Sequence, residues 1–130
     1  MATGATGTFV INQWREDVYD DADGAILTRV RADKTFDGDL LGTSTTELLT
    51  VQAATGGCAY VGLERVAGRL NDRAGTFVLH HDTVSWGDAT IAVAAVVPGS
   101  GTGELVGLEG RMTITRHEDD TWTWTLGYRT

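Results

Sequence analysis

Three side chains capable of acid–base chemistry lie on two neighbouring segments that are rich in strand-forming residues. Tyr60 and Glu64 belong to residues 59–70, and His81 belongs to residues 75–86. Side chains alternate between the two faces of a strand, so Tyr60 and Glu64 share one face. A carboxylate, an imidazole and a phenol on a common face could together move a proton and hydrogen-bond a substrate oxygen.

The turn between these segments decides whether His81 joins that face. If it holds two or four residues, even positions of the first strand face the same way as odd positions of the second. Glu64 and His81 are then direct or diagonal neighbours. The remaining residues of this predicted inner face are Tyr60, Gly62, Val66, Leu70, Phe77 and Leu79. The opposite, predicted solvent face holds Arg65, Arg69, Thr76, His80 and Asp82.

An inward carboxylate at position 64 has two interpretations. A buried charge is costly unless it is paired, so Glu64 either marks a functional site or is satisfied by Tyr60, His81 or an arginine within a filled core. The first interpretation makes Glu64 a general acid or base whose pKa is raised by burial, with His81 as its orienting partner or as the partner base.

The other elements predict an all-β fold with one domain at residues 8–130 behind a flexible lead-in at residues 1–7. The predicted strands cover residues 8–15, 26–36, 39–53, 59–70, 75–86, 90–97, 111–116 and 121–129. Asp37-Gly38 is a strong hairpin signal, residues 16–24 read as an acidic loop, and a bulge is expected in residues 39–53. Eight strands with mostly short connections favour a closed antiparallel up-and-down barrel, with a two-sheet sandwich as the alternative.

A stretch at residues 96–110 connects two of these strands and contains the only proline and many glycines. Pro98 cannot donate to a sheet ladder, and glycine reaches backbone angles that other residues avoid. We therefore expect the chain to leave its strand at Pro98 and cross one mouth of the barrel, with a short helical turn near residues 103–106.

The predicted lumen is aromatic and apolar. A three-residue loop at residues 118–120 would place Met112 and Ile114 beside Leu126 and Trp124. The candidate ligand-binding residues are Trp14, Phe77, Leu79, Met112, Ile114, Trp122, Trp124, Leu126 and Tyr128. Eight strands can enclose one small ligand or leave only enough room for side chains, so these residues are ligand contacts or core.

Composition restricts the partners. A formal net charge of -8 with ten scattered basic residues argues against nucleic acids and anionic membranes. Cys58 is the only cysteine, and the adjacent His80 and His81 face opposite ways, so neither a disulfide nor a metal site is expected. No signal peptide, membrane-spanning run or cofactor fingerprint is evident, which predicts a cytoplasmic protein without a cofactor. Residues 90–97 are apolar on both faces, which leaves a homo-oligomer open.

Several segments together resemble an uncharacterised bacterial domain family whose barrel is similar to that of allene oxide cyclase. The matching segments are residues 36–44, 60–65, 75–81 and 97–105. Residues 99–103 also resemble the glycine-rich turn of allene oxide cyclases and, more distantly, dirigent proteins. The resemblance implies an eight-stranded barrel with a central cavity, in which relatives by fold cyclise substrates or guide stereochemistry without a cofactor. In those enzymes a buried carboxylate lies in an apolar cavity, a role that Glu64 would have here.

These observations support two functions. The first is a cofactor-free isomerase or cyclase for a small hydrophobic substrate, with Glu64, His81 and Tyr60 as its catalytic residues. The alternative is a non-catalytic binding or carrier barrel in which the same groups only orient the ligand. A barrel filled by side chains, with residues 90–97 as an oligomer interface, would exclude both.

Overall fold

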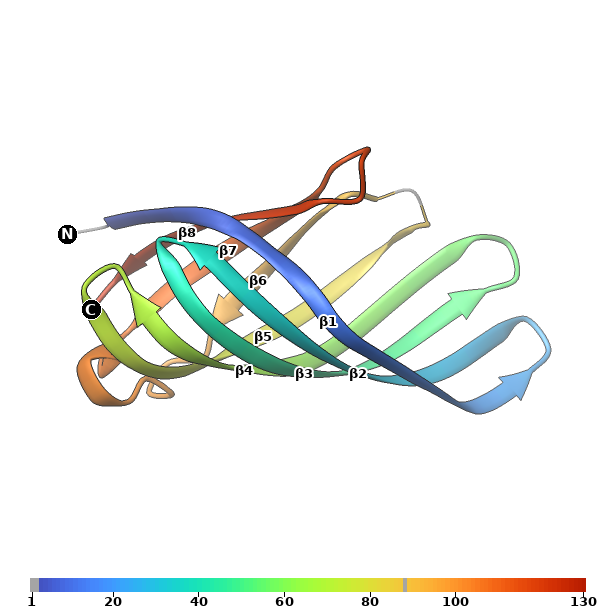
Figure 1. Ribbon diagram of the computed structural model, residues 1–130. Helices are drawn as coiled ribbons and strands as arrows, with labels where there is room; N and C mark the ends of the chain where they lie inside the picture. The colour runs from blue at the N-terminus through green and yellow to red at the C-terminus, as the bar shows by residue number, and fades with distance from the viewer. Residues whose placement is uncertain (1–2, 88) are drawn as a thin grey trace.

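Each strand of the computed structural model pairs antiparallel with the strands before and after it, and the last pairs back to the first, which closes a barrel (Figure 1). The strands are β1 (Thr3–Ala22), β2 (Ala25–Gly38), β3 (Leu40–Ala53), β4 (Gly57–Leu70), β5 (Arg73–Trp86), β6 (Ile91–Val96), β7 (Glu109–Arg116) and β8 (Trp122–Arg129). A short 3-10 helix, η1 (Gly103–Leu105), precedes β7. The structure describes residues 3–87 and 89–130. The predicted eight-stranded barrel is therefore confirmed.

The first strand is much longer than the sequence predicts. Residues 3–7, expected to be a flexible lead-in, pair with β8, beginning with Thr3 opposite Tyr128. Residues 1 and 2 lie outside the described part of the chain. Residues 16–22, expected to be an acidic loop, continue β1 and pair with β2 as far as Ala22 opposite Ala25. Both expectations are wrong because these residues lack the apolar alternation of a half-buried strand, and 16–22 are exposed throughout.

Two β-bulges interrupt β1, between Ile11 and Gln13 and between Val18 and Asp20. A bulge inserts one residue into a strand and reverses the side-chain alternation after it. The first bulge therefore puts Trp14 on the same inner face as Phe9 and Ile11. In a regular strand an even-numbered residue would face away from these two odd-numbered ones. The bulge expected in residues 39–53 is absent, since β3 keeps one continuous register with β2 and β4.

The two ends of the barrel differ because its strands differ in length. The β1–β2 and β3–β4 hairpins project beyond the shorter β6, β7 and β8 (Figure 1, right). Strand β8 pairs with β1 only as far as Phe9, and β5 pairs with β6 only through residues 79–81. At this end the wall is incomplete, and the lumen is open.

The opposite end is closed by residues 97–108. The Val97 amide donates to the Val78 carbonyl, and the Thr102 amide donates to the Thr76 carbonyl, so the segment follows β5 after β6 has ended. Leu105 and Leu108 are buried and cover the end of the lumen. The expected crossing after Pro98 and the short helical turn are both confirmed.

The closed half of the barrel is filled by inward side chains from every strand and the crossing segment. This core includes Phe36, Leu40, Val66, Leu70, Phe77, Leu79, Val96, Leu105, Leu108, Met112, Trp124 and Leu126. Met112 opposes Leu126 and Ile114 opposes Trp124, as the loop length predicts. Within the residues described, none of the helical segments has the length and apolar character of a membrane span.

Gly62 allows β3 and β4 to approach closely beneath the open half of the lumen. A Cβ atom there would collide with the Glu47 carbonyl oxygen and lie 2.8 Å from the Leu48 Cα. We expect Gly62→Ala to lower the free energy of unfolding by about 3 kcal/mol, since backbone atoms cannot yield as a side chain can. Urea denaturation measures this change. Gly127→Ala in β8 is the matched control, because nothing lies within 4 Å of its added Cβ. Equal stability of the two variants would contradict the packing argument.

Candidate active site

A layer of polar side chains lies between the filled half of the barrel and its open half. Among the described residues, the buried polar or charged side chains are Lys34, Ser44, Thr46, Glu64 and His81. They come from β2, β3, β4 and β5 and occupy inward positions of these strands. The turn before β5 holds two residues, so Glu64 opposes Leu79 and His81 opposes Gly62. Glu64 and His81, predicted to be direct or diagonal neighbours, are therefore diagonal neighbours.

The Glu64 carboxylate is at the centre of this layer and is fully buried. Its Oε1 accepts a hydrogen bond from Lys34 Nζ at 3.2 Å and lies 2.7 Å from His81 Nε2. Its Oε2 accepts a hydrogen bond from Ser44 Oγ at 2.5 Å. Three donors from three other strands thus satisfy one carboxylate.

These partners determine the ionisation of Glu64. Burial alone would raise the pKa, but the hydrogen bond from His81, the positive charge of Lys34 and the bond from Ser44 lower it to about 2. The expectation that burial gives Glu64 a raised pKa is therefore wrong, because the hydrogen bond from His81 and the charge of Lys34 outweigh the effect of burial. Glu64 is a permanent anion near neutral pH and has no proton to donate.

An ionised carboxylate can only accept hydrogen bonds, so it fixes the imidazole of His81. The Nε2 atom therefore carries a proton and donates a hydrogen bond to Glu64 Oε1. In the neutral form of the ring, the Nδ1 atom is a lone-pair acceptor. A carboxylate that orients an imidazole in this way prepares the second ring nitrogen to act as a base.

Above the polar layer lies a cavity of about 190 Å³. Its polar floor is formed by Lys34, Thr46 and His81, and its walls are mainly apolar. The wall residues are Phe9, Ile11, Trp14, Ala32, Leu48, Thr50, Tyr60, Ala92, Ile114 and Trp122. Glu64 and Ser44 do not line this cavity. Glu64 therefore acts on the floor through Lys34 and His81 and does not touch a molecule above it.

The predicted site residues divide between the two halves of the barrel. His81, Tyr60, Trp14, Ile114 and Trp122 line the cavity. Trp14 is half exposed at the rim, and its Nε1 donates to Glu16 Oε1 at 2.6 Å. In the aromatic part of the wall, Trp122 stacks on Phe9 with ring centroids 5.4 Å apart.

The other predicted ligand contacts do not reach this cavity. Five of them are fully buried in the closed half: Phe77, Leu79, Met112, Trp124 and Leu126. Tyr128 packs against the same core, and its hydroxyl is 2.6 Å from Asn71 Nδ2, which donates to it. For these six residues the packed-core interpretation fits their positions.

Sequence reasoning missed Lys34, Ser44 and Thr46. The signal for Lys34 is its position: it falls between Ala32 and Phe36 on the apolar face of an alternating strand. Its Nζ lies 4.6 Å from the centroid of the Phe9 ring, which adds a cation–π contact to its pairing with Glu64. In β3 the many threonines obscure the alternation, so no comparable signal distinguishes positions 44 and 46.

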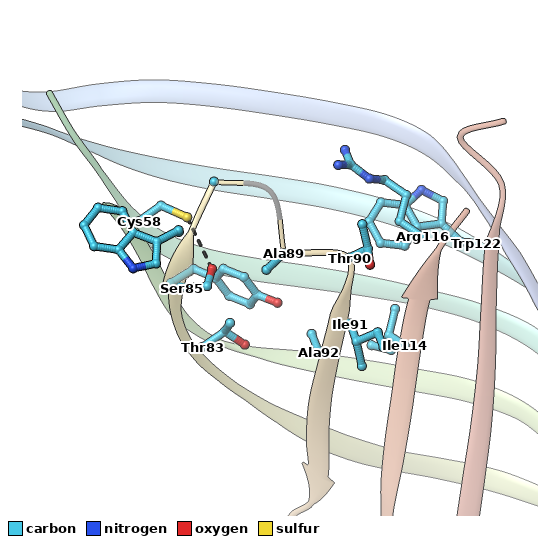
Figure 2. Close-up of a pocket in the computed structure, with 13 residues that line it drawn as sticks. Cys58, Thr83, Ser85, Ala89, Thr90, Ile91, Ala92, Ile114, Arg116 and Trp122 are labelled. Atoms are coloured by element: carbon cyan, nitrogen blue, oxygen red, sulfur yellow. Dashed lines mark hydrogen bonds between the residues drawn. The ribbon is translucent and has the colours of Figure 1, made fainter. Parts of the chain in front are cut away.

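A second hollow, which we call the slot, has a similar volume and lies where β5 and β6 separate (Figure 2). Thr83 and Ser85 of β5 lie on one side, and Ala92 of β6 and Ile114 of β7 lie on the other. The residues that line both this slot and the cavity are Tyr60, Ala92, Ile114 and Trp122. The slot therefore adjoins the cavity through the barrel wall. Cys58 lies in it with Sγ 3.5 Å from Ser85 Oγ.

The possibility of a metal site can be assessed from the donor groups. Across residues 3–87 and 89–130, no cluster of three or more histidine, cysteine, aspartate or glutamate side chains could hold a metal ion. The polar groups that face the cavity from its floor are instead an ammonium, an imidazole and a hydroxyl.

Fold and site together define a closed eight-stranded antiparallel barrel with an apolar cavity above a charged, hydrogen-bonded floor. The chain belongs to the family described as "Protein of unknown function (DUF3224)", whose model matches residues 5–128. A crystal structure of a DUF3224 protein of unknown function from Shewanella oneidensis MR-1 is similar, with 33% sequence identity and a TM-score of 0.88. The match covers 99% of this chain and 98% of that one.

A more distant structure has the same fold. It is named pyocyanin demethylase and shares 13% identity with a TM-score of 0.68, covering 98% of this chain and all of that one. At this identity the likeness shows the fold alone. A comparison with proteins of curated function gives no match.

The lowered pKa of Glu64 makes stability dependent on pH. Its ionised form is stabilised by folding, so the contribution is present above the ordinary pKa of 4.5 and is lost as the pH falls towards about 2. We expect the free energy of unfolding to fall by about 3 kcal/mol over this range through Glu64. Urea denaturation of the wild type and Glu64→Gln at several pH values measures the difference.

The Glu64→Gln substitution also leaves Lys34 without its anion, so it destabilises the protein by about 3 kcal/mol at neutral pH. Glu47→Gln is the control, because Glu47 forms an exposed ion pair with Arg31 at 3.3 Å and contributes little. Parallel pH profiles for wild type and Glu64→Gln would refute the assigned ionisation.

Thr46 and Ser44 provide a matched pair of buried hydroxyls on β3. Thr46 Oγ1 is buried without a hydrogen-bond partner among the described residues, whereas Ser44 Oγ donates to Glu64. We expect Thr46→Val to raise the free energy of unfolding by about 1 kcal/mol and Ser44→Ala to lower it by about 2 kcal/mol. Thermal and urea denaturation provide the measurement, and a destabilised Thr46→Val would show that this hydroxyl has a partner.

Proposed function

We propose that this barrel binds a small, mainly apolar carbonyl compound in its cavity and catalyses a cofactor-free proton transfer on it, as in an isomerase or cyclase. The observation that carries this proposal is the floor of the cavity. An imidazole held by a buried carboxylate lies next to an ammonium group, at the base of an otherwise apolar hollow.

His81 is the proposed base. Its Nε2–H is held by Glu64, so Nδ1 is available to take a proton from a carbon next to the substrate carbonyl. When that C–H bond breaks, its electron pair forms a carbon–carbon double bond, and the carbonyl oxygen becomes an enolate oxygen. Returning the proton to a different atom completes an isomerisation, or the enolate attacks within the folded substrate to close a ring.

Lys34 is the proposed electrostatic catalyst. A preorganised cation that faces developing negative charge is most effective where water is excluded. Lys34 Nζ is almost fully buried and lines the cavity floor, so it can stabilise the enolate oxygen. Tyr60 lines the same cavity and is the proposed hydrogen-bond donor to a substrate oxygen. Glu64 is a positioning residue in this scheme rather than the acid or base.

The apolar walls provide binding and orientation. Trp122, stacked on Phe9, and Ile114 form an aromatic and aliphatic surface that can hold an unsaturated or ring-containing substrate over the floor. Such positioning lowers the entropic cost of the reactive geometry. The structure named pyocyanin demethylase supports only an analogy of fold: a barrel of this shape can carry an enzyme.

A binding or carrier barrel is the second candidate. The observation that favours it is the completeness of the polar layer, since Glu64 is neutralised by Lys34 within the protein and the cluster has a structural role. In that case the floor orients a ligand without reacting. The two functions share the cavity and differ in whether His81 exchanges protons with the bound molecule.

The distinguishing experiment follows hydrogen–deuterium exchange next to a carbonyl. Cyclohexanone and acetophenone are incubated with the protein in D₂O, and loss of the α-hydrogen signals is recorded by proton NMR. We expect the wild type to accelerate exchange and His81→Gln to lose at least about 100-fold of that acceleration, the usual contribution of a positioned base. His80→Gln is the matched control, because His80 is exposed on the outer face of the same strand.

Binding is followed in parallel by the intrinsic tryptophan fluorescence, to which Trp14 and Trp122 at the cavity contribute. Saturable binding without accelerated exchange would contradict catalysis and support the carrier barrel. Exchange that is unchanged in His81→Gln would remove His81 from the mechanism.

A further inference from the structure

The side chains on the cavity floor have more hydrogen-bond donors than are used within the described protein. Lys34 Nζ has three N–H groups and makes one hydrogen bond within the described residues, to Glu64. Thr46 lines the same cavity, and its buried Oγ1 has no hydrogen-bond partner among the described residues. Lys34 can therefore donate to a molecule above the floor, and the Thr46 hydroxyl has a donor that no described residue accepts. Donors that face a common space are complemented by an atom that only accepts.

Among the described residues, no anionic group fills that role. Both oxygens of Glu64 already accept hydrogen bonds, and Glu64 does not line the cavity. Among the described residues that do line it, Lys34 is the only one with a permanent charge. The complementary group must come from the ligand and must be an oxygen that is, or becomes, negatively charged.

The charge balance of the floor adds a condition. Lys34 and Glu64 neutralise each other, so an anionic ligand would bring one unpaired negative charge into a buried, weakly polar space. Such a charge is costly unless it is paired. His81 is the group that can supply the balancing charge, because it is the titratable base that lines the floor.

Within residues 3–87 and 89–130, the surroundings of His81 contain no other group to carry this proton. The groups that face it are Glu64 and Tyr60 from β4, Lys34 from β2 and Thr46 from β3. From β6 and β7 the inward side chains near it are apolar: Ala92, Ala94, Met112 and Ile114. A proton taken up by this layer on ligand binding therefore resides on the imidazole.

We propose that the cavity floor binds one anionic oxygen of a single-ring molecule together with one proton, which His81 takes up. This inference rests on the proposed function, since an enolate beside an imidazolium is what proton transfer from a neutral carbonyl compound to His81 creates. A stable carboxylate bound with one proton has the same charges in the same places. Ring carboxylates are therefore the ligand class of this site, and ring ketones with an α-hydrogen are the matching substrate class.

The size of the cavity sets the size of the ring. An engineered cavity of about 150 Å³ accommodates benzene, and the hollow here is about 190 Å³. One six-membered ring with a small substituent fits this volume. Benzoate and cyclohexanecarboxylate are the charged probes, and benzamide is the uncharged probe of matching shape.

Isothermal titration calorimetry tests the inference. Titrations in two buffers of different ionisation enthalpy, at about pH 8, give the number of protons taken up per ligand; an ordinary free histidine is neutral there. We expect benzoate to bind at least about tenfold more tightly than benzamide, with uptake approaching one proton. Its affinity should fall by up to about tenfold per unit rise in pH, because a bound proton becomes harder to supply.

Two variants test the assigned groups. His81→Gln should bind benzoate without proton uptake and at least about tenfold more weakly, and the ratio of its benzoate affinity to its benzamide affinity should fall towards one. Thr46→Val removes a hydroxyl that has no partner in the described part of the protein, so the fold is retained; its benzoate affinity should fall about three- to tenfold. Circular dichroism confirms that each variant is folded.

The outcomes separate this inference from the proposed function. Equal binding of benzamide and benzoate, or benzoate binding without proton uptake, would overturn the inference and leave a ligand-binding barrel. Ketone exchange by the wild type without binding of either carboxylate would overturn the inference alone. Absence of binding by every probe together with absence of ketone exchange would overturn both.

Discussion

One buried carboxylate joins four consecutive strands of this barrel. Glu64 of β4 accepts hydrogen bonds from side chains of β2, β3 and β5, and it is fully removed from water. A buried anion would be severely destabilising alone, and here it is neutralised by Lys34 and satisfied by three donors. The arrangement holds only if the registers of all four strands are correct. The same contacts hold His81 and Lys34 at the base of the cavity.

This charged layer separates two environments within one lumen. Below it, large apolar side chains and the crossing segment fill the barrel; above it, shorter strands on one side leave a cavity with aromatic walls. One half of the lumen is therefore a filled core, and the other half is a cavity. The polar layer belongs to both, since Glu64 faces the core while Lys34 and His81 face the cavity. Protein stability and the chemistry proposed for the site consequently depend on the same ion pair.

Local patterns in the sequence predicted the fold and part of the site. The alternation in residues 59–70 and 75–86, with an even-numbered turn, was enough to place Glu64 and His81 together. Where exposure hid the alternation, as in residues 16–22, the prediction was wrong. Lys34 could not be assigned as the partner of Glu64 because their strands are not sequential neighbours. The pKa of Glu64 is lowered first by the hydrogen bond from His81, whose place beside Glu64 was predicted, and then by the Lys34 charge, which was not. The unequal lengths of the strands determine which apolar residues line the cavity, and the local sequence patterns did not reveal these lengths.

The junction of β5 with β6 gives the barrel an intrinsic seam. These strands share three residue pairs, whereas β4 and β5 share fourteen. Local opening begins where the fewest backbone hydrogen bonds must break. We therefore expect β5 and β6 to separate before any other pair of neighbouring strands. The seam lies against the slot that adjoins the cavity, so opening of the seam would join the slot to the lumen. His81 lies on the seam opposite Ala94, whereas Lys34, Ser44 and Glu64 lie on strands with continuous pairing. Opening of the seam would therefore displace the imidazole edge of the polar layer and leave the rest of it in place.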